Sequence, residues 1–462
     1  MSGPAPGAPE VLGSRTSARR AVVAASLGTA IEWYDYGLFG LAAGLAINPV
    51  FFPQQHGLVG LLAAMATFAV GFLIRPVGGI IIASLGDRWG RRPTLMLTVV
   101  MMSIGTIAIG LLPTPAQIGV LAPILLVFFR AVQGFGAGAE LSGALTLVAE
   151  FYPGRKRGLM TGIAYGSSGA GVILATLAML TVSQTSRDFF LKWGWRIPFL
   201  LSAVMFLVAI WIRRRLEETP EYRAAMRRLE TEKTGRRRTP VRDALRSQPG
   251  MVVRGFLIWS GHNCFAYLAA TFAVNYLITV QRMPSARALM LSLITSIVFY
   301  FASLFWSWLS DRVGHRRLIY VFGVAVIVVI APYLLLLQTG KFWAALVAMA
   351  GASCVAGISQ GVMGAVVTTM FPTEYRFSAI TIGKELNAAV IAGPTPFIAT
   401  ALLAALGGAP WLVVGFVVLM ALTTILSMVM RRSTLQAMHA RTAADLPAAT
   451  GAAGLETTKG VG

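Results

Sequence analysis

The stretch GDRWGRRP, residues 86–93, occurs a second time in degenerate form as SDRVGHRRL, residues 310–318. Each copy lies in a short polar connection between two apolar runs. A second pair of related stretches, FYPGRKRG at 151–158 and FPTEYRFS at 371–378, has a similar separation. Two markers repeated about 220 residues apart predict that the chain is built from two copies of one unit.

The chain around these markers is unusually apolar. Of its 462 residues, 56% are hydrophobic and only 12% are charged, whereas a soluble domain carries about 25% charged residues. Apolar runs of about 20 residues, each long enough to cross a bilayer as a helix, recur along the chain. The composition predicts an all-α membrane protein, and the continuous runs, which do not alternate apolar with polar residues, disfavour a β-barrel.

The apolar runs predict twelve transmembrane helices, six on each side of one long polar connection. We expect the spans at 21–47, 58–85, 94–112, 118–149, 158–182, 197–212, 252–280, 287–309, 317–337, 342–370, 377–404 and 411–430. Together with the repeat, they predict two pseudo-symmetric six-helix bundles related by an axis along the membrane normal, which is one known transporter plan.

The polar segments divide the predicted bundles. We expect a disordered tail at 1–20, an N-terminal bundle at 21–212, a central loop at 213–250, a C-terminal bundle at 251–431 and a second disordered tail at 432–462. The N-terminal residues contain no apolar run that would predict a cleaved signal peptide.

The basic residues predict the orientation. Thirty of the 39 Lys and Arg residues lie on the side that holds both termini, and six lie on the other side. This bias predicts cytoplasmic termini and explains the net charge of +21 without a nucleic-acid partner. The only cysteines, Cys264 and Cys354, lie in apolar runs, so we expect neither a disulfide framework nor a metal site.

Four acidic side chains, those of Glu32, Asp35, Glu140 and Glu385, lie within the predicted spans, where each costs about 2.5–3.5 kcal/mol on insertion scales. Glu32 and Asp35, in GTAIEWYDYGLFG at 28–40, are three residues apart and share one helix face. Glu140 lies in the fourth span. Such a group can load and release a proton if burial and nearby cations change between states. We expect Glu32, Asp35 and Glu140 to couple protons, and structural ion pairs with buried arginines are the alternative.

Three basic side chains, Arg75, Arg130 and Lys384, also lie within predicted spans. The planar fork of Arg suits a carboxylate, so buried cations favour an organic anion as the substrate. The alternatives are that the arginines pair with the buried acids and that Lys384 and its neighbour Glu385 neutralise one another.

The seventh span carries a polar stripe, because Asn263, Tyr267 and Thr271 recur at every fourth position. His262 adjoins the stripe, and a hydrogen-bonded structural role is favoured over a proton relay. The aromatic residues at 33–36 suit either a quaternary ammonium group, through cation–π contact, or simple packing. The candidate substrate ligands are Tyr36, Arg75, Arg130, Gln133, Asn263, Tyr267, Lys384 and Glu385.

These motifs together resemble the major facilitator superfamily. GDRWGRRP resembles its loop motif, and RAVQGFGAGAE at 130–140 resembles its fourth-helix motif. More narrowly, EWYDYGLFG, FLIRPVGG, WGWRIPF and LEETPEY resemble the metabolite:proton symporter group, within a sugar-porter-like branch. The resemblance covers about residues 20–430. It implies a monomeric, non-enzymatic transporter of a bacterial cytoplasmic membrane, driven by the proton gradient and needing no cofactor.

The resemblance also assigns a gate to the loop motif. It implies that Asp87 meets helix ends and arginines of the other half in the outward-open state, contacts that stabilise a carboxylate. Simple positive-inside anchoring is the alternative. In this chain His315 replaces an Arg expected in the second copy, and Met370 replaces a Glu found in many relatives. The predicted gating residues are Asp87, Arg88, Arg91, Arg92, Glu150, Arg157, Asp311 and Arg312.

The expected function is proton-coupled uptake of a small organic acid, such as a di- or tricarboxylate or a shikimate-like or aromatic acid. The alternative is proton symport of a zwitterionic osmolyte of the betaine or proline type, although a C-terminal tail without heptads disfavours osmosensing. A non-transporting receptor is a remote alternative, because no signalling domain is apparent. The four histidines are scattered along the sequence, which disfavours an intramembrane enzyme.

Overall fold

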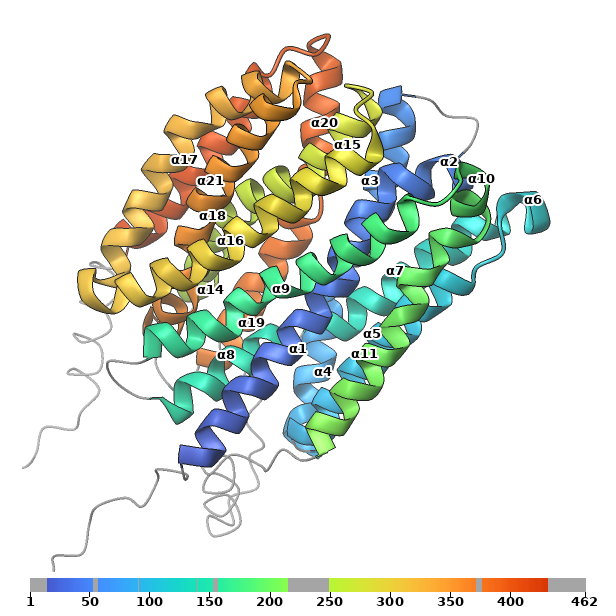
Figure 1. Cartoon of the computed structure of the whole chain (residues 1–462). Coiled ribbons are helices and arrows are strands. Elements are labelled where there is room, and N and C mark those ends of the chain that lie inside the picture. The colour runs from blue at the N-terminus through green and yellow to red at the C-terminus, as the bar shows by residue number, and fades with distance from the viewer. Residues whose placement is uncertain are drawn as a thin grey trace, which may run out of the picture.

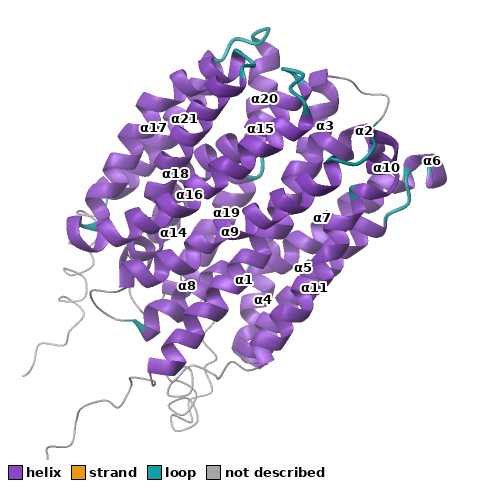
Figure 2. Ribbon diagram, viewed as in Figure 1, coloured by secondary structure: helices purple, strands orange, loops and turns teal. Residues whose placement is uncertain are grey.

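The structure is a computed structural model that describes residues 15–52, 57–89, 91–138, 140–152, 157–214, 249–370 and 376–430. Throughout these residues the chain forms helices joined by short loops, and they contain no strand (Figure 2). The prediction of an all-α protein is therefore confirmed. Residues 15–20 of the predicted N-terminal tail belong to a helix, because the first helix begins at Arg15. The rest of that tail, the predicted C-terminal tail and most of the predicted central loop lie outside the described residues, so the domain bounds stay predictions.

The first half of the chain forms a run of helices broken by short turns and two π-helical segments. In chain order they are α1 (Arg15–Ala42), η1 (Ala43–Ile47), α2 (Asn48–Phe51), α3 (Gly57–Leu73), α4 (Arg75–Trp89), α5 (Arg91–Leu111), α6 (Pro115–Ile118), α7 (Leu121–Ala137), α8 (Glu140–Phe151), α9 (Arg157–Ser183), α10 (Arg187–Phe189), η2 (Phe190–Gly194) and α11 (Arg196–Arg214).

The second half is built in the same way. Its helices are α14 (Pro249–Tyr267), η3 (Leu268–Phe272), α15 (Ala273–Thr279), α16 (Ser285–Val313), α17 (His315–Gln338), α18 (Phe342–Met370), α19 (Arg376–Asn387), η4 (Ala388–Ala392), α20 (Thr395–Ala405) and α21 (Trp411–Val429).

Each of the twelve predicted spans coincides with one helix or with consecutive helical pieces. Within the described residues, eight helices are long and apolar enough to cross a membrane, or nine if the bent pair Arg187–Gly194 and Arg196–Val208 counts as one span. Helix α1, which carries Glu32 and Asp35, is not among the eight. The structure is thus consistent with twelve spans, while the side of the membrane on which the termini lie stays a prediction.

The two halves lie against each other along the length of the molecule (Figure 1). Helix α9 of the first half packs on α16 and α18 of the second, α3 packs on α20, and α4 packs on α19. These contacts bring residues that are hundreds of positions apart in the sequence to one central interface.

Glycines hold α3 and α4 close to α7 within the first half. A Cβ atom at Gly134 would meet the backbone carbonyl of Gly71, and one at Gly138 would meet the carbonyl of Arg75. Small residues allow such close approach of helices in a membrane protein. These glycines therefore place Arg75, at the start of α4, against the end of α7.

Candidate functional site

Four of the predicted site residues form one buried network between the halves. The Arg75 guanidinium donates to Glu32 Oε1 at 2.6 Å and to Glu385 Oε2 at 2.8 Å. Lys384 Nζ donates to Glu385 Oε1 at 2.6 Å. Glu32 and Arg75 belong to the first half and the other two residues to the second, so the network is an ionic link across the central interface. The pairing that the sequence left as an alternative role is present for all four.

Asp35 lies on the same face of α1 as Glu32, but its surroundings differ. Its side chain is 1% exposed, and neither carboxylate oxygen has a hydrogen-bond partner among the described residues. Arg130 and Glu32 are its charged neighbours, and the Thr106 hydroxyl lies close to it. A buried carboxyl group with no hydrogen bond is costly, and intramembrane ionisable groups commonly mark proton or ion pathways.

The Arg130 side chain is held by other groups. Its guanidinium donates to the Phe68 carbonyl at 3.1 Å and to the side-chain oxygen of Gln133, and it lies 4.0 Å from the centre of the Phe39 ring. Gln133 in turn donates to Thr106 Oγ1 at 2.7 Å. Arg130 and Gln133 therefore form a polar cluster beside Asp35.

Glu140 occupies a third environment, at the start of α8. It is 3% exposed and accepts a hydrogen bond of 3.0 Å from Thr98 Oγ1 of α5. It acts electrostatically on Glu32, so the three predicted proton-coupling acids belong to one region of the first half. Their role in moving protons stays a prediction.

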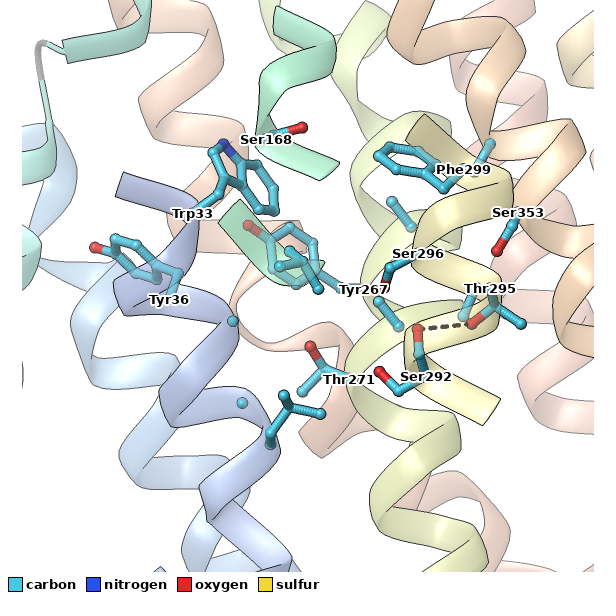
Figure 3. A pocket seen from close by; sticks show the side chains of 18 of the residues that line it. Trp33, Tyr36, Ser168, Tyr267, Thr271, Ser292, Thr295, Ser296, Phe299 and Ser353 are labelled. Carbon is cyan, nitrogen blue, oxygen red and sulfur yellow. Dashed lines mark hydrogen bonds between the residues drawn. The ribbon is translucent and has the colours of Figure 1, made fainter. Parts of the chain in front are cut away.

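A cavity of about 90 Å³ lies between the two halves. Its walls come from α1, α3 and α9 on one side and from α14, η3, α16 and α18 on the other. None of its lining residues is an Arg, Lys, Asp or Glu. The polar and aromatic lining side chains are Trp33, Tyr36, Phe68, Ser168, His262, Tyr267, Thr271, Ser292, Thr295, Ser296, Phe299, Ser353 and Gln360 (Figure 3).

The central cavity is too small to hold a drug-sized solute in this structure. A volume of about 90 Å³ holds several waters, whereas sites for drug-sized ligands measure about 300–1,000 Å³. A solute of that size therefore requires the walls to move apart.

Tyr36 separates the cavity from the ionic network. Tyr36 is one of the lining residues, and the Arg75 guanidinium lies 4.9 Å from the centre of its ring. One turn away, Trp33 and Tyr267 stack with 5.9 Å between ring centres, so that one ring from each half meets across the interface. A movement of Tyr36 would connect the cavity with the charged groups behind it.

The predicted substrate ligands divide into two groups. Tyr36 and Tyr267 line the cavity, whereas the other six do not. Asn263, one of these six, donates to Asn387 Oδ1 at 2.7 Å. Binding of substrate by Arg75, Arg130, Gln133, Asn263, Lys384 and Glu385 therefore stays a prediction that requires a different arrangement of the halves.

The predicted ligands do not include any residue of α16. Three hydroxyl-bearing residues of this helix line the cavity, Ser292, Thr295 and Ser296, together with Phe299. Their spacing of three and four residues places them on one helix face, and this spacing is the signal that could have identified them.

His262 also lines the cavity and connects the halves by hydrogen bonds. Its Nδ1 lies 2.6 Å from Ser359 Oγ and its Nε2 lies 3.1 Å from the Tyr165 hydroxyl. The Ser359 hydroxyl donates to the Ala356 carbonyl at 3.0 Å and therefore accepts from Nδ1–H. The arrangement fits a neutral imidazole that accepts from Tyr165, as a hydrogen-bonded structural histidine would.

The halves also touch at the end where α1 begins and α21 ends, called here the terminal end. Asp311 Oδ2, near the end of α16, accepts a hydrogen bond of 3.1 Å from the Leu159 amide in the first turn of α9. Ser307 Oγ of α16 donates to the Gly158 carbonyl at 2.9 Å. A carboxylate at a helix N-terminus is stabilised by the helix dipole, so this contact has the physical form expected of a latch.

The other predicted gating residues are placed as follows. Arg157 donates to the Ala149 carbonyl at 3.4 Å, and Arg312 lies 4.0 Å from the ring centre of Trp308. The side chains of Asp87, Arg88, Arg91, Arg92 and Glu150 lie outside the described residues.

At the opposite end, called here the far end, Asn275 links the halves. Its side-chain oxygen accepts from the Gly44 amide at 2.7 Å, and its side-chain nitrogen donates to the Gly40 carbonyl at 2.9 Å. The halves are therefore joined on both sides of the central cavity. Two helical halves around a central cavity, joined at each end, are the arrangement of a membrane transporter.

The chain belongs to the Major Facilitator Superfamily, whose family model matches residues 25–384. It is therefore a multi-pass membrane transporter and not an enzyme. This finding confirms the family that the sequence motifs predicted.

Two relatives are similar over most of their length. The shikimate transporter of Escherichia coli K12 is 37% identical over 398 residues, which cover 86% of this chain and 90% of the relative. The proline/betaine transporter of the same organism is 35% identical over 390 residues, which cover 82% and 77%.

The fold is shared with a solved transporter. The proton:xylose symporter XylE, bound to 6-bromo-6-deoxy-D-glucose, matches with a TM-score of 0.71 and 16% identity, covering 90% of this chain and 95% of that one. A partially occluded inward-open form of XylE from E. coli matches with a TM-score of 0.68 and 14% identity, covering 90% and 97%. Matches at this level of identity show the fold alone.

Proposed function

We propose that the protein is a proton-coupled symporter that takes up a small hydroxylated organic acid. The observation that carries this proposal is the juxtaposition of Asp35, buried without a hydrogen bond, with the ionic network that links the halves. The proton gradient is the driving force and no cofactor is needed. The protein works as a monomer in a bacterial cytoplasmic membrane, with both termini in the cytoplasm.

Proton movement is assigned to Asp35 in this proposal. The group takes up a proton when the site faces the outside and releases it when the surroundings change on opening to the inside. Its neighbours Arg130, Glu32 and Thr106 belong to the same half. The change in surroundings must therefore come from water entry or from the other half moving away, which is what alternating access provides.

The ionic network makes the opening of the interface depend on charge. Arg75 holds one carboxylate from each half, Glu32 and Glu385. Protonation of either carboxylate would weaken its bond to the guanidinium, because charge-assisted hydrogen bonds are roughly twice as strong as neutral ones. In this proposal the network is the place where a proton biases the separation of the halves.

The cavity lining supports a hydroxylated ring acid as the substrate. Hydroxyl groups on α16, among them those of Ser292 and Ser296, line the same cavity as aromatic rings of α1 and α14 (Figure 3). Hydroxyls are suited to hydrogen-bond substrate hydroxyls, and rings are suited to pack on the face of a carbon ring. The similarity to a relative named a shikimate transporter supports this class of substrate. The carboxylate would reach the arginines when Tyr36 moves.

A zwitterionic osmolyte is the second candidate. The observation that favours it is the cluster of aromatic rings, including Trp33 and Tyr267, in a cavity without a lining Lys or Arg. Aromatic faces attract quaternary ammonium groups through cation–π interaction. Relatives named proline/betaine transporters support this alternative.

The test is uptake of labelled solutes by proteoliposomes that contain the purified protein. Labelled shikimate, glycine betaine and proline are offered separately, with an inside-alkaline pH gradient or with the gradient collapsed by a protonophore. The proposal predicts gradient-dependent accumulation of shikimate. Accumulation of betaine or proline instead selects the second candidate, and entry of shikimate unaffected by the protonophore contradicts proton symport.

A further inference from the structure

One part of the central cavity wall is made of polar side chains from both halves. Ser168 lies on α9 of the first half, and His262 and Gln360 lie on α14 and α18 of the second half. These three residues, called here the polar corner, are 2%, 2% and 1% exposed. Because a buried polar group is costly without a hydrogen bond, the partners of each donor and acceptor show what the corner can bind.

Tyr165 of α9 connects the polar corner across the interface. Its hydroxyl donates to His262 Nε2 at 3.1 Å, and its backbone carbonyl accepts from Gln360 Nε2 at 2.9 Å. The ring of Trp259 packs edge-on against the rings of Tyr165 and His262, with 5.9 Å and 5.8 Å between centres. Both nitrogens of His262 are engaged, by Tyr165 and by Ser359, so His262 acts as a positioning residue here.

The side-chain amide of Gln360 keeps one group without a partner. Its nitrogen uses both hydrogens, one on the Tyr165 carbonyl and one on Ser168 Oγ at 2.8 Å. A backbone carbonyl can only accept, so this contact fixes which end of the amide is the nitrogen. None of the described residues donates to the side-chain oxygen of Gln360, which leaves an acceptor at the cavity wall.

Ser168 supplies the complementary group. Its hydroxyl oxygen accepts from Gln360, and none of the described residues accepts the hydroxyl proton. The adjacent Ser167, by contrast, donates to the Ile163 carbonyl of its own helix at 2.8 Å. The polar corner therefore offers one donor and one acceptor side by side, and they belong to opposite halves.

We infer that the polar corner binds a hydroxyl group of the transported solute, which accepts from Ser168 and donates to the side-chain oxygen of Gln360. A hydroxyl both donates and accepts, whereas a carboxylate only accepts and a quaternary ammonium group does neither. The bound hydroxyl joins the two halves, so it stabilises the closed arrangement for hydroxylated solutes. This inference rests on the proposed function and adds to it the residues that select the hydroxyl.

The test is the affinity of the purified full-length protein for two acids, measured by isothermal titration calorimetry. Shikimate is compared with cyclohex-1-enecarboxylate, which is the same ring acid without hydroxyl groups. The variant Ser168→Ala removes the donor of the polar corner. The matched control, Ser167→Ala, removes the adjacent hydroxyl, which does not line the cavity. Gln360→Met, which removes the acceptor at similar side-chain length, is the second variant if Ser168→Ala fails to fold.

The inference predicts that the wild-type protein binds shikimate more tightly than the hydroxyl-free acid. Ser168→Ala should weaken shikimate binding about fivefold to tenfold, as the loss of one hydrogen bond implies, and leave the hydroxyl-free acid unchanged. Gln360→Met should also reduce the preference for shikimate, and Ser167→Ala should not.

Equal losses for the two acids would mean that the polar corner is only structural, and equal losses in Ser168→Ala and Ser167→Ala would remove the specific role of Ser168. Either result would overturn the inference while the proposed function stands. If the wild-type protein does not bind shikimate, the proposed function fails and this inference fails with it.

Discussion

Among the described residues, Asp35 differs from the other buried carboxylates of the central region because neither of its oxygens accepts a hydrogen bond. Glu32 and Glu385 both bond to Arg75, Glu385 also bonds to Lys384, and Glu140 accepts from Thr98. A group in a fixed ion pair has less freedom to exchange protons than one whose charge has no direct partner.

The first prediction concerns Asp35→Asn. An amide of the same shape cannot carry a proton, so we expect proteoliposomes with this variant to lose accumulation of substrate against its gradient. Exchange of labelled for unlabelled substrate should continue, because it needs no net proton movement. Retained uphill uptake would contradict the assignment, and Glu140→Gln tests whether the effect belongs to Asp35 alone.

The second prediction concerns Arg75, which is 4% exposed and shared by two carboxylates. Arg75→Gln leaves Glu32 buried without its bonded cation and Glu385 with Lys384 alone, so we expect a loss of stability of about 3–5 kcal/mol. Lys384→Gln removes a partner of Glu385 alone and should cost less. Thermal unfolding of both variants in detergent measures the difference, and an equal cost for the two would argue against the network as described.

The third prediction concerns the aromatic wall of the central cavity, where Trp33 and Tyr267 stack. Tyr267→Ala removes a ring that lines the cavity, so we expect the apparent affinity for the transported solute to fall at least about tenfold, the cost of one lost aromatic contact. Trp343→Ala, which removes an exposed ring far from the cavity lining, is the control. Unchanged affinity in Tyr267→Ala would show that this ring does not contribute to binding of the transported solute.

Among the elements, contacts at the two ends of the bundle join the halves on either side of the cavity. Asp311 of α16 meets the start of α9 at the terminal end, and Asn275 of α15 meets the π-helical turn η1 at the far end. Each contact joins one element of the first half to one of the second.

The fourth prediction is that weakening one contact opens the end at which it lies. Asp311→Asn removes the charge at the α9 N-terminus, and Asn275→Ala removes both bonds to the first half. With spin labels at each end, we expect Asp311→Asn to lengthen distances at the terminal end and Asn275→Ala to lengthen them at the far end. Each variant is the control for the other, and identical distance changes in both would contradict the assignment.

The elements were largely predictable from the sequence, because apolar runs bounded by charged connections fix where helices lie. The run at 342–370 has the same bounds as α18. The first span was predicted at 21–47, whereas the helical segment runs from Arg15 to Phe51, since a helix continues beyond its apolar part. The π-helical segments had no signal in the pattern of apolar residues.

The composition of the site was predictable only in part. Buried charges are conspicuous in an apolar chain, so Glu32, Asp35 and Arg75 could be selected from sequence. The bond from Arg75 to Glu385 joins residues 310 positions apart and depends on the packing of α4 on α19. The cavity-lining hydroxyls of α16 were missed because serine and threonine are common in membrane helices, where they bond to their own backbone, as Thr295 does with the Leu291 carbonyl.

At the scale of the whole molecule, the two halves are held together at both ends and at the centre, with a small cavity between them. Proton symport requires that a proton and a solute cross this closed assembly together. The property to test is therefore the coupling of proton movement to solute movement, rather than either movement alone.

The most direct measurement of that coupling is proton entry on addition of solute. Proteoliposomes loaded with the pH-sensitive dye pyranine receive shikimate or proline outside, with no imposed pH gradient. We predict that the lumen acidifies for the solute that is transported, and that Asp35→Asn abolishes this acidification. Entry of labelled solute without any change in luminal pH would contradict the account.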